Sequence, residues 1–484
     1  MNSKVTKSGL FTAVFMLMSL VTSCESDNPS YQGVGPLKDW TLQVTDTIVF
    51  TEIEQPIAIP HKVYNPNGEV VKSSSLHLPG YADYYTCQND SVTMHYTVFE
   101  DQACNKTLRL YCYLPEGTVY KDVYFAFRPD LSQSTPTHPH IYVDKPGTLQ
   151  DHIDPKMEKE ITGLTLYGLL NTVDQIYLRK LLGAPETFQA WSEEVGMDVL
   201  DPNNNFIILP RDDEFFAQVH SEYNLSFLDL RNVVYKSVDD PEDTFFFLDY
   251  KVTDQYVKPK NIVRFLFYCC ANLKEIYLPR WYEGINSCVF DMCGRLETVH
   301  YPDKLEEYAR EITTARHFDD LAYCSKIRTF DLGKQTTKYK VDEEGSLWEV
   351  ECNNLLRCAK LPDRTRFDLP VGATLSSNAL AWYPQLTDLY VHETNPSIYL
   401  DLESRAGYLD DLVSSQMCDR ITFHVPQGYL QEFTNRLHFN IWPDMKVVDD
   451  VTDFVVTDSV PTKSTLRTTE SPSKRIYTLK YANE

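Results

Sequence analysis

The chain has 484 residues, of which 43% are hydrophobic and 24% charged, the composition of folded protein rather than of a disordered chain. Its formal net charge of −24 at pH 7 repels phosphate backbones, which argues against nucleic acid as a partner. The length predicts two or three domains, because a single core rarely grows to this size.

Residues 1–23 predict a secretory signal. Lys4 and Lys7 supply the positive start, and the apolar run over residues 10–21 is shorter than the roughly 20 residues that a membrane-spanning helix needs. No later stretch is long and apolar enough to span a membrane. Without the two lysines the remaining chain carries a net charge of −26.

The signal ends in Leu20-Val21-Thr22-Ser23-Cys24, which resembles the lipobox of bacterial lipoproteins. The resemblance implies that Cys24 is acylated and becomes the first residue after cleavage. Each buried CH₂ contributes about 0.8 kcal/mol, so two or three acyl chains give a stable anchor. The acidic residues within positions 25–27 resemble the surface-export signal of lipoproteins in some anaerobic Gram-negative bacteria. We therefore expect a protein that is lipid-anchored in the outer membrane and faces the cell exterior.

Eleven of the twelve cysteines remain once Cys24 is set aside, an odd number, so at least one is free or paired between chains. The spacing of Cys87, Cys104 and Cys112 leaves open whether two of them form a disulfide.

Residues 24–38 are polar with Gly and Pro, and predict a tether. Residues 39–132 then alternate between apolar and polar, and predict an antiparallel, immunoglobulin-like β-sandwich. The expected strands cover residues 47–50, 92–99, 107–114 and 119–127, with a turn at Asn65-Pro66-Asn67-Gly68. A spacer or an accessory binding module is the expected role. His138-Pro139-His140 is interpreted as an exposed linker.

A repeated unit occupies residues 141–449. The clearest copies span residues 267–279, 290–302, 321–332 and 380–391, and the first two begin 23 residues apart. Each copy has an apolar residue, then Cys or Tyr, then Leu or Ile at steps of three, followed by a short alternating strand. Shorter matches begin at Leu225 and Ile421. Such a period predicts a leucine-rich-repeat solenoid with parallel strands, in which stacked units share one core.

Alternation within each strand predicts which side chains point outward. Ile276 and Leu278 face the core, so their neighbours Glu275 and Tyr277 face solvent. The same frame predicts one ligand-binding face of aromatic rings and carboxylates, which consists of Phe227, Asp229, Glu275, Tyr277, Thr298, His300, Thr329, Asp331, Asp388 and Tyr390. Rings can stack on sugars or apolar groups, and carboxylates accept hydrogen bonds from hydroxyls or pair with basic groups. A merely solvated face is the alternative.

These repeats, with an aromatic residue, a cysteine and a strand ending in Leu-Pro, resemble the BspA-like leucine-rich-repeat family of bacterial surface proteins. Residues 146–149 and 164–168 resemble the opening segment of that family, residues 342–347 and 367–370 its irregular long repeat, and residues 425–429 its closing cap. The resemblance covers about the last two thirds of the chain. It implies a binding or adhesive role without naming the ligand.

No enzyme motif supports a catalytic role. The sequence lacks a Gly-x-Ser-x-Gly elbow, a phosphate-binding glycine loop and a Cys-x-x-Cys pair. A calcium loop that begins at Asp201 fails because Phe206 replaces the required Gly. We therefore expect a non-catalytic protein that uses no cofactor or metal.

Three functions remain open. The first is an adhesin that binds a host or bacterial surface protein, and the second is a glycan-binding lipoprotein of a polysaccharide-uptake system. A glycoside hydrolase is a remote third, because the many carboxylates include no marked pair. Residues 450–484 are rich in Ser, Thr and Pro, and predict a flexible tail.

Overall fold

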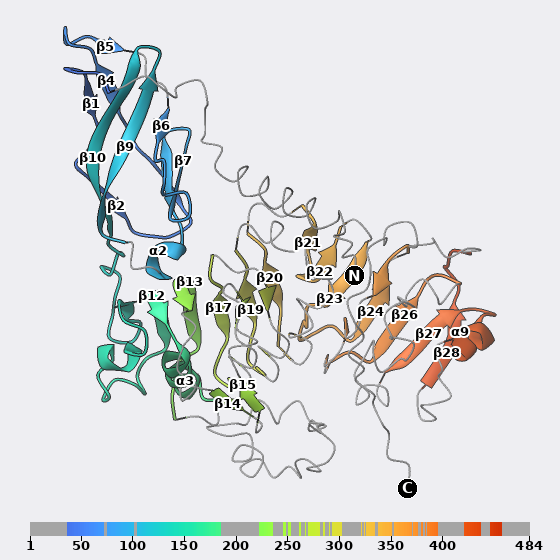
Figure 1. Cartoon of the computed structure of the whole chain (residues 1–484). Coiled ribbons are helices and arrows are strands. Elements are labelled where there is room, and N and C mark those ends of the chain that lie inside the picture. Colours follow the sequence, from blue (N-terminus) through green and yellow to red (C-terminus); the bar gives the residue numbers. More distant parts are fainter. Residues whose placement is uncertain are drawn as a thin grey trace, which may run out of the picture.

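In the computed structural model, the chain is mostly β-sheet with few helices among the residues that the structure describes. These are residues 36–71, 75–100, 104–184, 222–235, 245–247, 250–252, 261–262, 267, 270–280, 284–285, 290, 293–302, 321, 324, 326–333, 337–350, 353–369, 371–375, 379–380, 383, 385–394, 421–436 and 446–456. Figure 1 shows a β-rich N-terminal region standing at one end of a long row of strands, the repeat region. Cys24, the signal segment and most of the predicted tether lie outside the described residues.

In the N-terminal region, residues 36–127, the described residues form ten strands and one short helix. These are β1 (Thr41–Gln43), β2 (Thr47–Phe50), β3 (Pro56–Ala58), β4 (Lys62–Tyr64), β5 (Val70–Val71), β6 (Leu76–His77), β7 (Tyr85–Gln88), β8 (Ser91–Met94), α2 (Thr97–Glu100), β9 (Lys106–Leu114) and β10 (Gly117–Phe127). Three predicted strands agree closely with β2, β9 and β10, and Gly68 has the positive φ of 80° that the predicted turn needs. The strand expected over residues 92–99 ends at Met94, where α2 follows.

Three sheets form this region, with the orders β1-β4-β5, β2-β10-β9-β6 and β3-β8-β7. Most pairs are antiparallel, as predicted, but β2 pairs in parallel with β10, with Phe50 opposite Phe127. The expectation of a purely antiparallel sandwich is therefore wrong at this pair. No hairpin joins β2 to β10, since seven strands intervene in the chain, so connection length does not impose an antiparallel pair.

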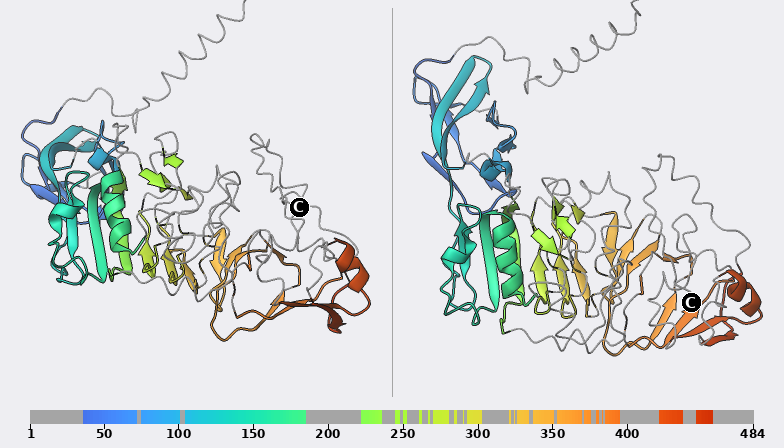
Figure 2. Two further views of the ribbon diagram at one scale, coloured as in Figure 1. Left: turned by 90° about the horizontal axis from the view of Figure 1, so that it is seen from below. Right: turned by 60° about the horizontal axis from the view of Figure 1, so that its bottom comes forward.

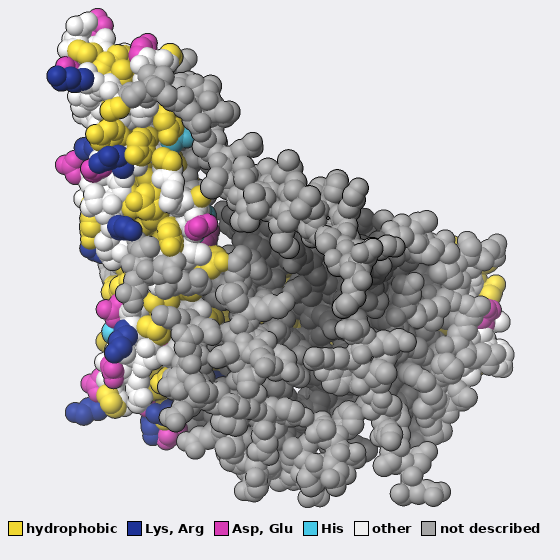
Figure 3. Space-filling model, viewed as in Figure 1, with side chains coloured by type: hydrophobic (Ala, Val, Ile, Leu, Met, Phe, Trp, Pro, Cys, Tyr) yellow, Lys and Arg dark blue, Asp and Glu magenta, His cyan; other side chains and the backbone are white. Residues whose placement is uncertain are grey.

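The hairpin β9–β10 carries a tyrosine-rich outer surface. Inward-facing residues such as Leu108 and Val123 are buried, whereas Tyr111, Tyr113 and Tyr120 alternate with buried neighbours and are at least partly exposed. Figure 3 shows hydrophobic side chains, a class that there includes tyrosine, gathered over the N-terminal region. The Tyr111 and Tyr113 rings are nearly parallel, with centroids 6.3 Å apart.

The repeat region begins with β11 (His140–Val143), the 3₁₀ helix η3 (Leu149–His152), β12 (Gly163–Leu170), α3 (Thr172–Leu181) and β13 (Phe227–Tyr235). One buried carboxylate organises this start. Asp174, 1% exposed, accepts hydrogen bonds from the backbone N–H groups of Gly147, Leu149 and Asn171. Burial raises the pKa of Asp174, although these N–H donors oppose the shift. Asn171 in turn caps α3 by accepting from the Asp174 N–H.

The remaining elements are β14 (Phe245–Phe247), β15 (Tyr250–Val252), β16 (Asn261–Ile262), β17 (Glu275–Tyr277), β18 (Gly284–Ile285), β19 (Thr298–His300), β20 (Thr329–Asp331), β21 (Tyr339–Val341), β22 (Leu347–Glu349), β23 (Asn354–Arg357), β24 (Arg366–Leu369), β25 (Thr374–Leu375), β26 (Asp388–Val391), β27 (Thr422–Pro426), α9 (Leu430–Arg436) and β28 (Lys446–Val451). Most of these strands continue the row in Figures 1 and 2, whereas β14 and β15 form a separate antiparallel pair beside it. Within the described residues no helix is long and apolar enough to cross a membrane.

Six strands form one parallel sheet in the order β11-β12-β13-β17-β19-β20. Equivalent positions of consecutive predicted repeats lie side by side, since Phe227, Glu275, Thr298 and Thr329 are aligned across four strands. This confirms the predicted parallel stacking for these copies. A second parallel sheet, β24-β26-β27-β28, contains the predicted strands near Leu389 and Phe423, and between the two lies the mixed sheet β21-β22-β23-β25.

The apolar repeat positions form the core, as expected. The rings of Phe267 and Phe290 are buried and stack with centroids 5.5 Å apart. The buried thiol of Cys293 donates to the Phe267 carbonyl at 2.9 Å, and that of Cys324 donates to the Phe290 carbonyl at 3.2 Å. Each cysteine thus ties its unit to the unit before it. No disulfide joins any two of Cys87, Cys104 and Cys112.

Buried hydrophobic side chains fall into two clusters among the described residues. The first runs from Leu42 in the N-terminal region into the repeat region as far as Leu356, and the second runs from Trp348 to Phe433 with Tyr429 and Val447 against it. The N-terminal region and the first repeats therefore share one continuous core.

Two predicted boundaries change. His138 and His140 do not form an exposed linker, because β11 begins at His140 and the His138 ring lies 3.1 Å from the Thr165 hydroxyl. At the other end, order extends past residue 449, where the flexible tail was expected to begin. β28 ends at Val451, and the Val455 N–H donates to the His392 carbonyl at 2.8 Å. The rest of the predicted tail lies outside the described residues.

Candidate binding face

Eight of the ten predicted face residues lie together on the six-stranded sheet. Each belongs to β13, β17, β19 or β20 and alternates with a buried residue such as Ile276 or Val299. Phe227, Glu275, Tyr277, Thr298, His300 and Thr329 are half-buried, and Asp331 is exposed. The outward direction predicted from alternation is therefore correct for these seven residues.

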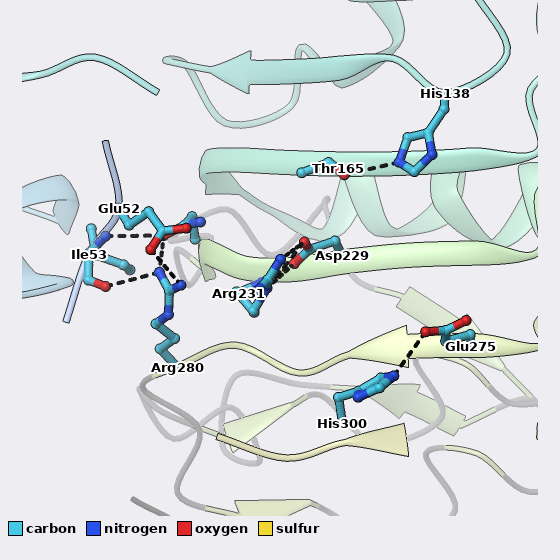
Figure 4. Close-up of polar contacts among 10 residues, drawn as sticks. Glu52, Ile53, His138, Thr165, Asp229, Arg231, Glu275, Arg280 and His300 are labelled. Carbon is cyan, nitrogen blue, oxygen red and sulfur yellow. Dashed lines mark hydrogen bonds and ion pairs between the residues drawn. The ribbon is translucent and has the colours of Figure 1, made fainter. Parts of the chain in front are cut away.

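Asp229 is the exception, since it is 4% exposed. Its carboxylate accepts two-point hydrogen bonds from Arg231, with Nη2 2.6 Å from Oδ2 and Nε 3.0 Å from Oδ1 (Figure 4). This carboxylate raises the pKa of Arg231. Both oxygens of Asp229 are thus engaged within the protein, so the prediction of Asp229 as a ligand-binding residue is not supported by its surroundings.

Tyr277 lies between a cation and an imidazole. Arg231, from β13, lies over the Tyr277 ring at 4.6 Å. His300, from β19 on the other side, is stacked on the ring at 3.7 Å with an interplanar angle of 4°. Because both ring faces are covered, only the edge and hydroxyl of Tyr277 can meet a ligand. Neither face of the Tyr277 ring is therefore open for the sugar stacking that the sequence analysis considered.

His300 links two carboxylates across three strands. Its Nε2 lies 2.9 Å from Glu275 Oε1, and its Nδ1 lies 2.8 Å from Asp331 Oδ2. Burial would raise the pKa of Asp331, but hydrogen bonds from His300 and from the Gly333 N–H outweigh burial and hold this pKa below its ordinary value. The predicted residues Glu275, His300 and Asp331 therefore form one hydrogen-bonded row.

The other two predicted residues, Asp388 and Tyr390, lie on the separate β24-β26-β27-β28 sheet. The ten residues predicted to form one ligand-binding face therefore lie on two sheets, because the β21-β22-β23-β25 sheet intervenes. Its antiparallel strands β21 and β22 end the side-by-side repetition of equivalent strands.

The second parallel sheet nevertheless repeats the same arrangement. Arg366 lies 3.6 Å over the Tyr390 ring and forms a two-point ion pair with Asp368. His424 stacks on the other side of Tyr390 at 4.0 Å with an interplanar angle of 4°. We call each set a stack: stack 1 is Arg231, Tyr277 and His300, and stack 2 is Arg366, Tyr390 and His424.

His424 also links two carboxylates, as His300 does. Its Nε2 lies 3.0 Å from Asp388 Oδ1, and its Nδ1 lies 2.8 Å from Asp450 Oδ1. Hydrogen bonds from the Thr387 hydroxyl and from His424 lower the pKa of Asp388. The two sheets thus present the same order of groups: a paired arginine, a covered tyrosine, and a histidine between two carboxylates.

The second half of β13 joins the strand face to the N-terminal region. Asn232 Oδ1, in a side chain that is 3% exposed, accepts from the Ile53 N–H at 3.1 Å and from Arg280 Nη1 at 2.8 Å. Arg280 Nη2 also lies 2.8 Å from Glu52 Oε2 (Figure 4). This junction fixes the N-terminal region against the first repeats.

No protein-family model and no curated protein matches this chain. Among solved structures, a leucine-rich cell surface protein from Faecalibacterium prausnitzii A2-165 is similar over 50% of this chain and 81% of its own, with 13% identity and a TM-score of 0.24. The pneumococcal vaccine antigen PcpA is similar over 68% of this chain and 74% of its own, with 10% identity and a TM-score of 0.16. At these TM-scores neither likeness supports an argument about fold or function.

Sequence reasoning missed Arg231, Arg366 and His424, although the signal was present. Arg231 follows Asp229 by two residues and so lies on the same side of the strand; the same rule places His424 outward between buried Phe423 and Val425. The described residues contain no group of three or more His, Cys, Asp or Glu side chains placed to hold a metal ion.

Proposed function

We propose that this protein is a leucine-rich-repeat surface lipoprotein that is anchored through Cys24 and binds a protein partner on its strand face, without catalysis. The proposal rests on the outward-facing side chains that are aligned across β13, β17, β19 and β20. A similar set of side chains is aligned across β24, β26 and β27. Parallel stacking of repeated units, of which those of β17 and β19 begin 23 residues apart, is the geometry expected of this repeat class.

The covered tyrosines favour a protein partner over a sugar on this face. Tyr277 and Tyr390 offer edges and hydroxyls beside Glu275, Asp331 and Asp388, so the face suits hydrogen bonds and ion pairs with a protein surface. The side chains already hold one another in place, which lowers the ordering cost of binding.

The test uses the double variant Tyr277→Ala/Tyr390→Ala. A pull-down with the full chain immobilised through its C-terminus, probed with host matrix proteins and bacterial surface extracts, identifies a binding partner. We expect the double variant to lose at least tenfold in affinity for that partner while keeping its circular dichroism spectrum. Thr45→Ala, on the exposed surface of the N-terminal region, is the control. Unchanged affinity in the double variant would remove the strand face as the binding surface.

The anchor is tested separately by labelling cells with a fatty-acid analogue. Label on the wild type and none on Cys24→Ala supports acylation at Cys24. Label that survives the substitution contradicts it.

A glycan-binding lipoprotein is the second candidate, and the tyrosine-rich surface of β9–β10 favours it. Tyr120 is 43% exposed, its ring centroid lies 6.0 Å from that of Tyr111, and Arg109 lies over one face of its ring at 4.3 Å. Exposed tyrosines beside a polar side chain suit carbohydrate recognition. On a glycan array, a signal that disappears in Tyr120→Ala but persists in the double variant above supports this candidate over the first.

A further inference from the structure

Three histidines of the two parallel sheets have a hydrogen-bond acceptor at each ring nitrogen. His300 and His424 each lie between two carboxylates, with nitrogen–oxygen distances of 2.8–3.0 Å. His392, at the end of β26, has Nε2 2.9 Å from Asp368 Oδ1 and Nδ1 2.9 Å from the Asp453 carbonyl oxygen. The three rings are largely shielded, with side chains 15%, 10% and 22% exposed for His300, His424 and His392.

These acceptors cannot act as donors. A backbone carbonyl only accepts, and a carboxylate only accepts while it is ionised. Hydrogen bonds hold the pKa values of Asp331, Asp368 and Asp388 below the ordinary range, so these carboxylates are ionised at neutral pH. A neutral imidazole has one N–H and one lone pair, so it can satisfy only one of its two acceptors. All contacts of each ring are satisfied together only when both nitrogens carry protons.

We propose that His300, His392 and His424 form a proton-controlled switch that sets the charge and order of the strand face, and thereby regulates binding there. The inference rests on the proposed function for its biological effect, but the switch itself is a property of the free protein. When a ring releases its proton to solvent, one nitrogen lone pair faces a carboxylate or carbonyl oxygen at about 3 Å. That contact becomes repulsive, and the acceptor turns away.

The charged groups around each ring make the change large. The groups that face the three rings are Glu275, Tyr277 and Asp331 at His300; Asp388, Tyr390 and Asp450 at His424; and Asp368 at His392. Arg231 and Arg366 lie over Tyr277 and Tyr390, and each is paired with an aspartate that raises its pKa. The charge of Lys446 helps to lower the pKa of Asp388. The arginines stay charged, so the loss of three protons from the rings makes the face more negative by three charges.

The proton also supports the stacks. A cationic ring on Tyr277 or Tyr390 gains cation–π attraction that a neutral ring lacks. Above the range in which imidazole titrates, stack 1 and stack 2 therefore lose both a hydrogen bond and part of their stacking. A partner that needs the ordered face binds best on the acidic side of that range, and a strongly acidic partner is repelled on the other side.

The first test measures the melting temperature of the free full-length chain between about pH 5.5 and 8.5. Groups that gain partners when protonated stabilise the fold at low pH, and that contribution is lost as pH rises. We expect the wild type to lose at least about 3 °C more across this range than the variant His300→Gln/His392→Gln/His424→Gln. The exposed residue His152 gives the control His152→Gln, which should follow the wild type. Parallel curves for the wild type and the triple variant overturn the proposal.

A second measurement keeps the test valid if the triple variant does not fold. Nitrogen-15 NMR of the labelled histidines, assigned with the three single His→Gln variants, reports protons on each ring nitrogen. We expect both nitrogens of these three rings to carry protons where the wild type is most stable in the first test, and one nitrogen of each ring to lose its proton over the pH range in which that stability is lost. Rings that hold a single proton throughout the range overturn the switch. Neither readout involves a ligand, so failure of the switch and failure of the binding face in the tyrosine test are distinguishable.

Discussion

Gly168 in β12 allows the first two strands of the repeat region to approach each other, and its replacement should be costly. Its φ is +96°, and a Cβ built there would lie 2.2 Å from the Val143 carbonyl oxygen of β11 and 2.9 Å from the Tyr142 ring. Gly428 has nearly the same φ, +88°, but a Cβ there meets nothing within 4 Å. The pair therefore separates backbone strain from crowding.

The expected magnitudes follow from these two contributions. Forcing an L side chain into the left-handed region costs about 1–2 kcal/mol, and both Gly168→Ala and Gly428→Ala bear this cost. Crowding against a backbone carbonyl that cannot rotate away adds about 1–3 kcal/mol in Gly168→Ala alone. We expect a free energy of unfolding about 2–5 kcal/mol below wild type for Gly168→Ala, and about 1–2 kcal/mol below for Gly428→Ala.

Urea unfolding, followed by circular dichroism, measures both values. Equal losses in the two alanine variants would refute the close approach of β11 to β12 at Gly168. A larger loss in Gly428→Ala would also refute it, because that position has room for the added methyl group.

Two further predictions concern the junction at Asn232 and the stability of the fold at low pH. Asn232→Ala leaves the Ile53 N–H and Arg280 without the Asn232 acceptor, and should lower the free energy of unfolding by about 2–4 kcal/mol in urea titrations. The control Asn67→Ala, at an exposed position, should change it by less than about 0.5 kcal/mol. An equally small change in Asn232→Ala contradicts the role of Asn232 in the junction. Hydrogen bonds from Arg366, and to a smaller extent from His392, lower the pKa of Asp368. The ionised carboxylate therefore stabilises the fold above the ordinary aspartate pKa, and this stabilisation is lost as the pH falls through the lowered pKa. The melting-temperature advantage of the wild type over Asp368→Asn should therefore shrink from about pH 5 to pH 2, and an advantage that stays constant with pH counts against this reasoning.

Alternation along single strands predicted much of the architecture because it is a local property. Ile276, Val299 and Phe330 were each assigned to the core from their own neighbours, and the register places them side by side. The same rule, applied further along β13 and to β27, would have identified Arg231 and His424, which the sequence analysis missed. It says nothing about which strand lies next to which, so the break between the sheets of His300 and His424 could not be predicted.

Contacts between distant segments were also beyond sequence reasoning. Arg280 contacts the Ile53 carbonyl 227 positions earlier, and no pattern in either segment marks that pairing. His140, next to Pro139, looked like a linker because the strand β11 has only four residues. The parallel pair β2–β10 likewise depends on how the whole N-terminal region closes, not on its turn sequences.

The division of the buried side chains into two clusters has a consequence for how the molecule fails under stress. Leu347 and Leu356 belong to the first cluster, whereas their neighbours Trp348 and Leu355 belong to the second, so the boundary runs along the paired strands β22 and β23. Stack 2 depends on the smaller cluster alone, whereas stack 1 shares its support with the N-terminal region. Damage that unfolds the β24-β26-β27-β28 end of the row would thus leave the other end, with stack 1, still folded against the N-terminal region.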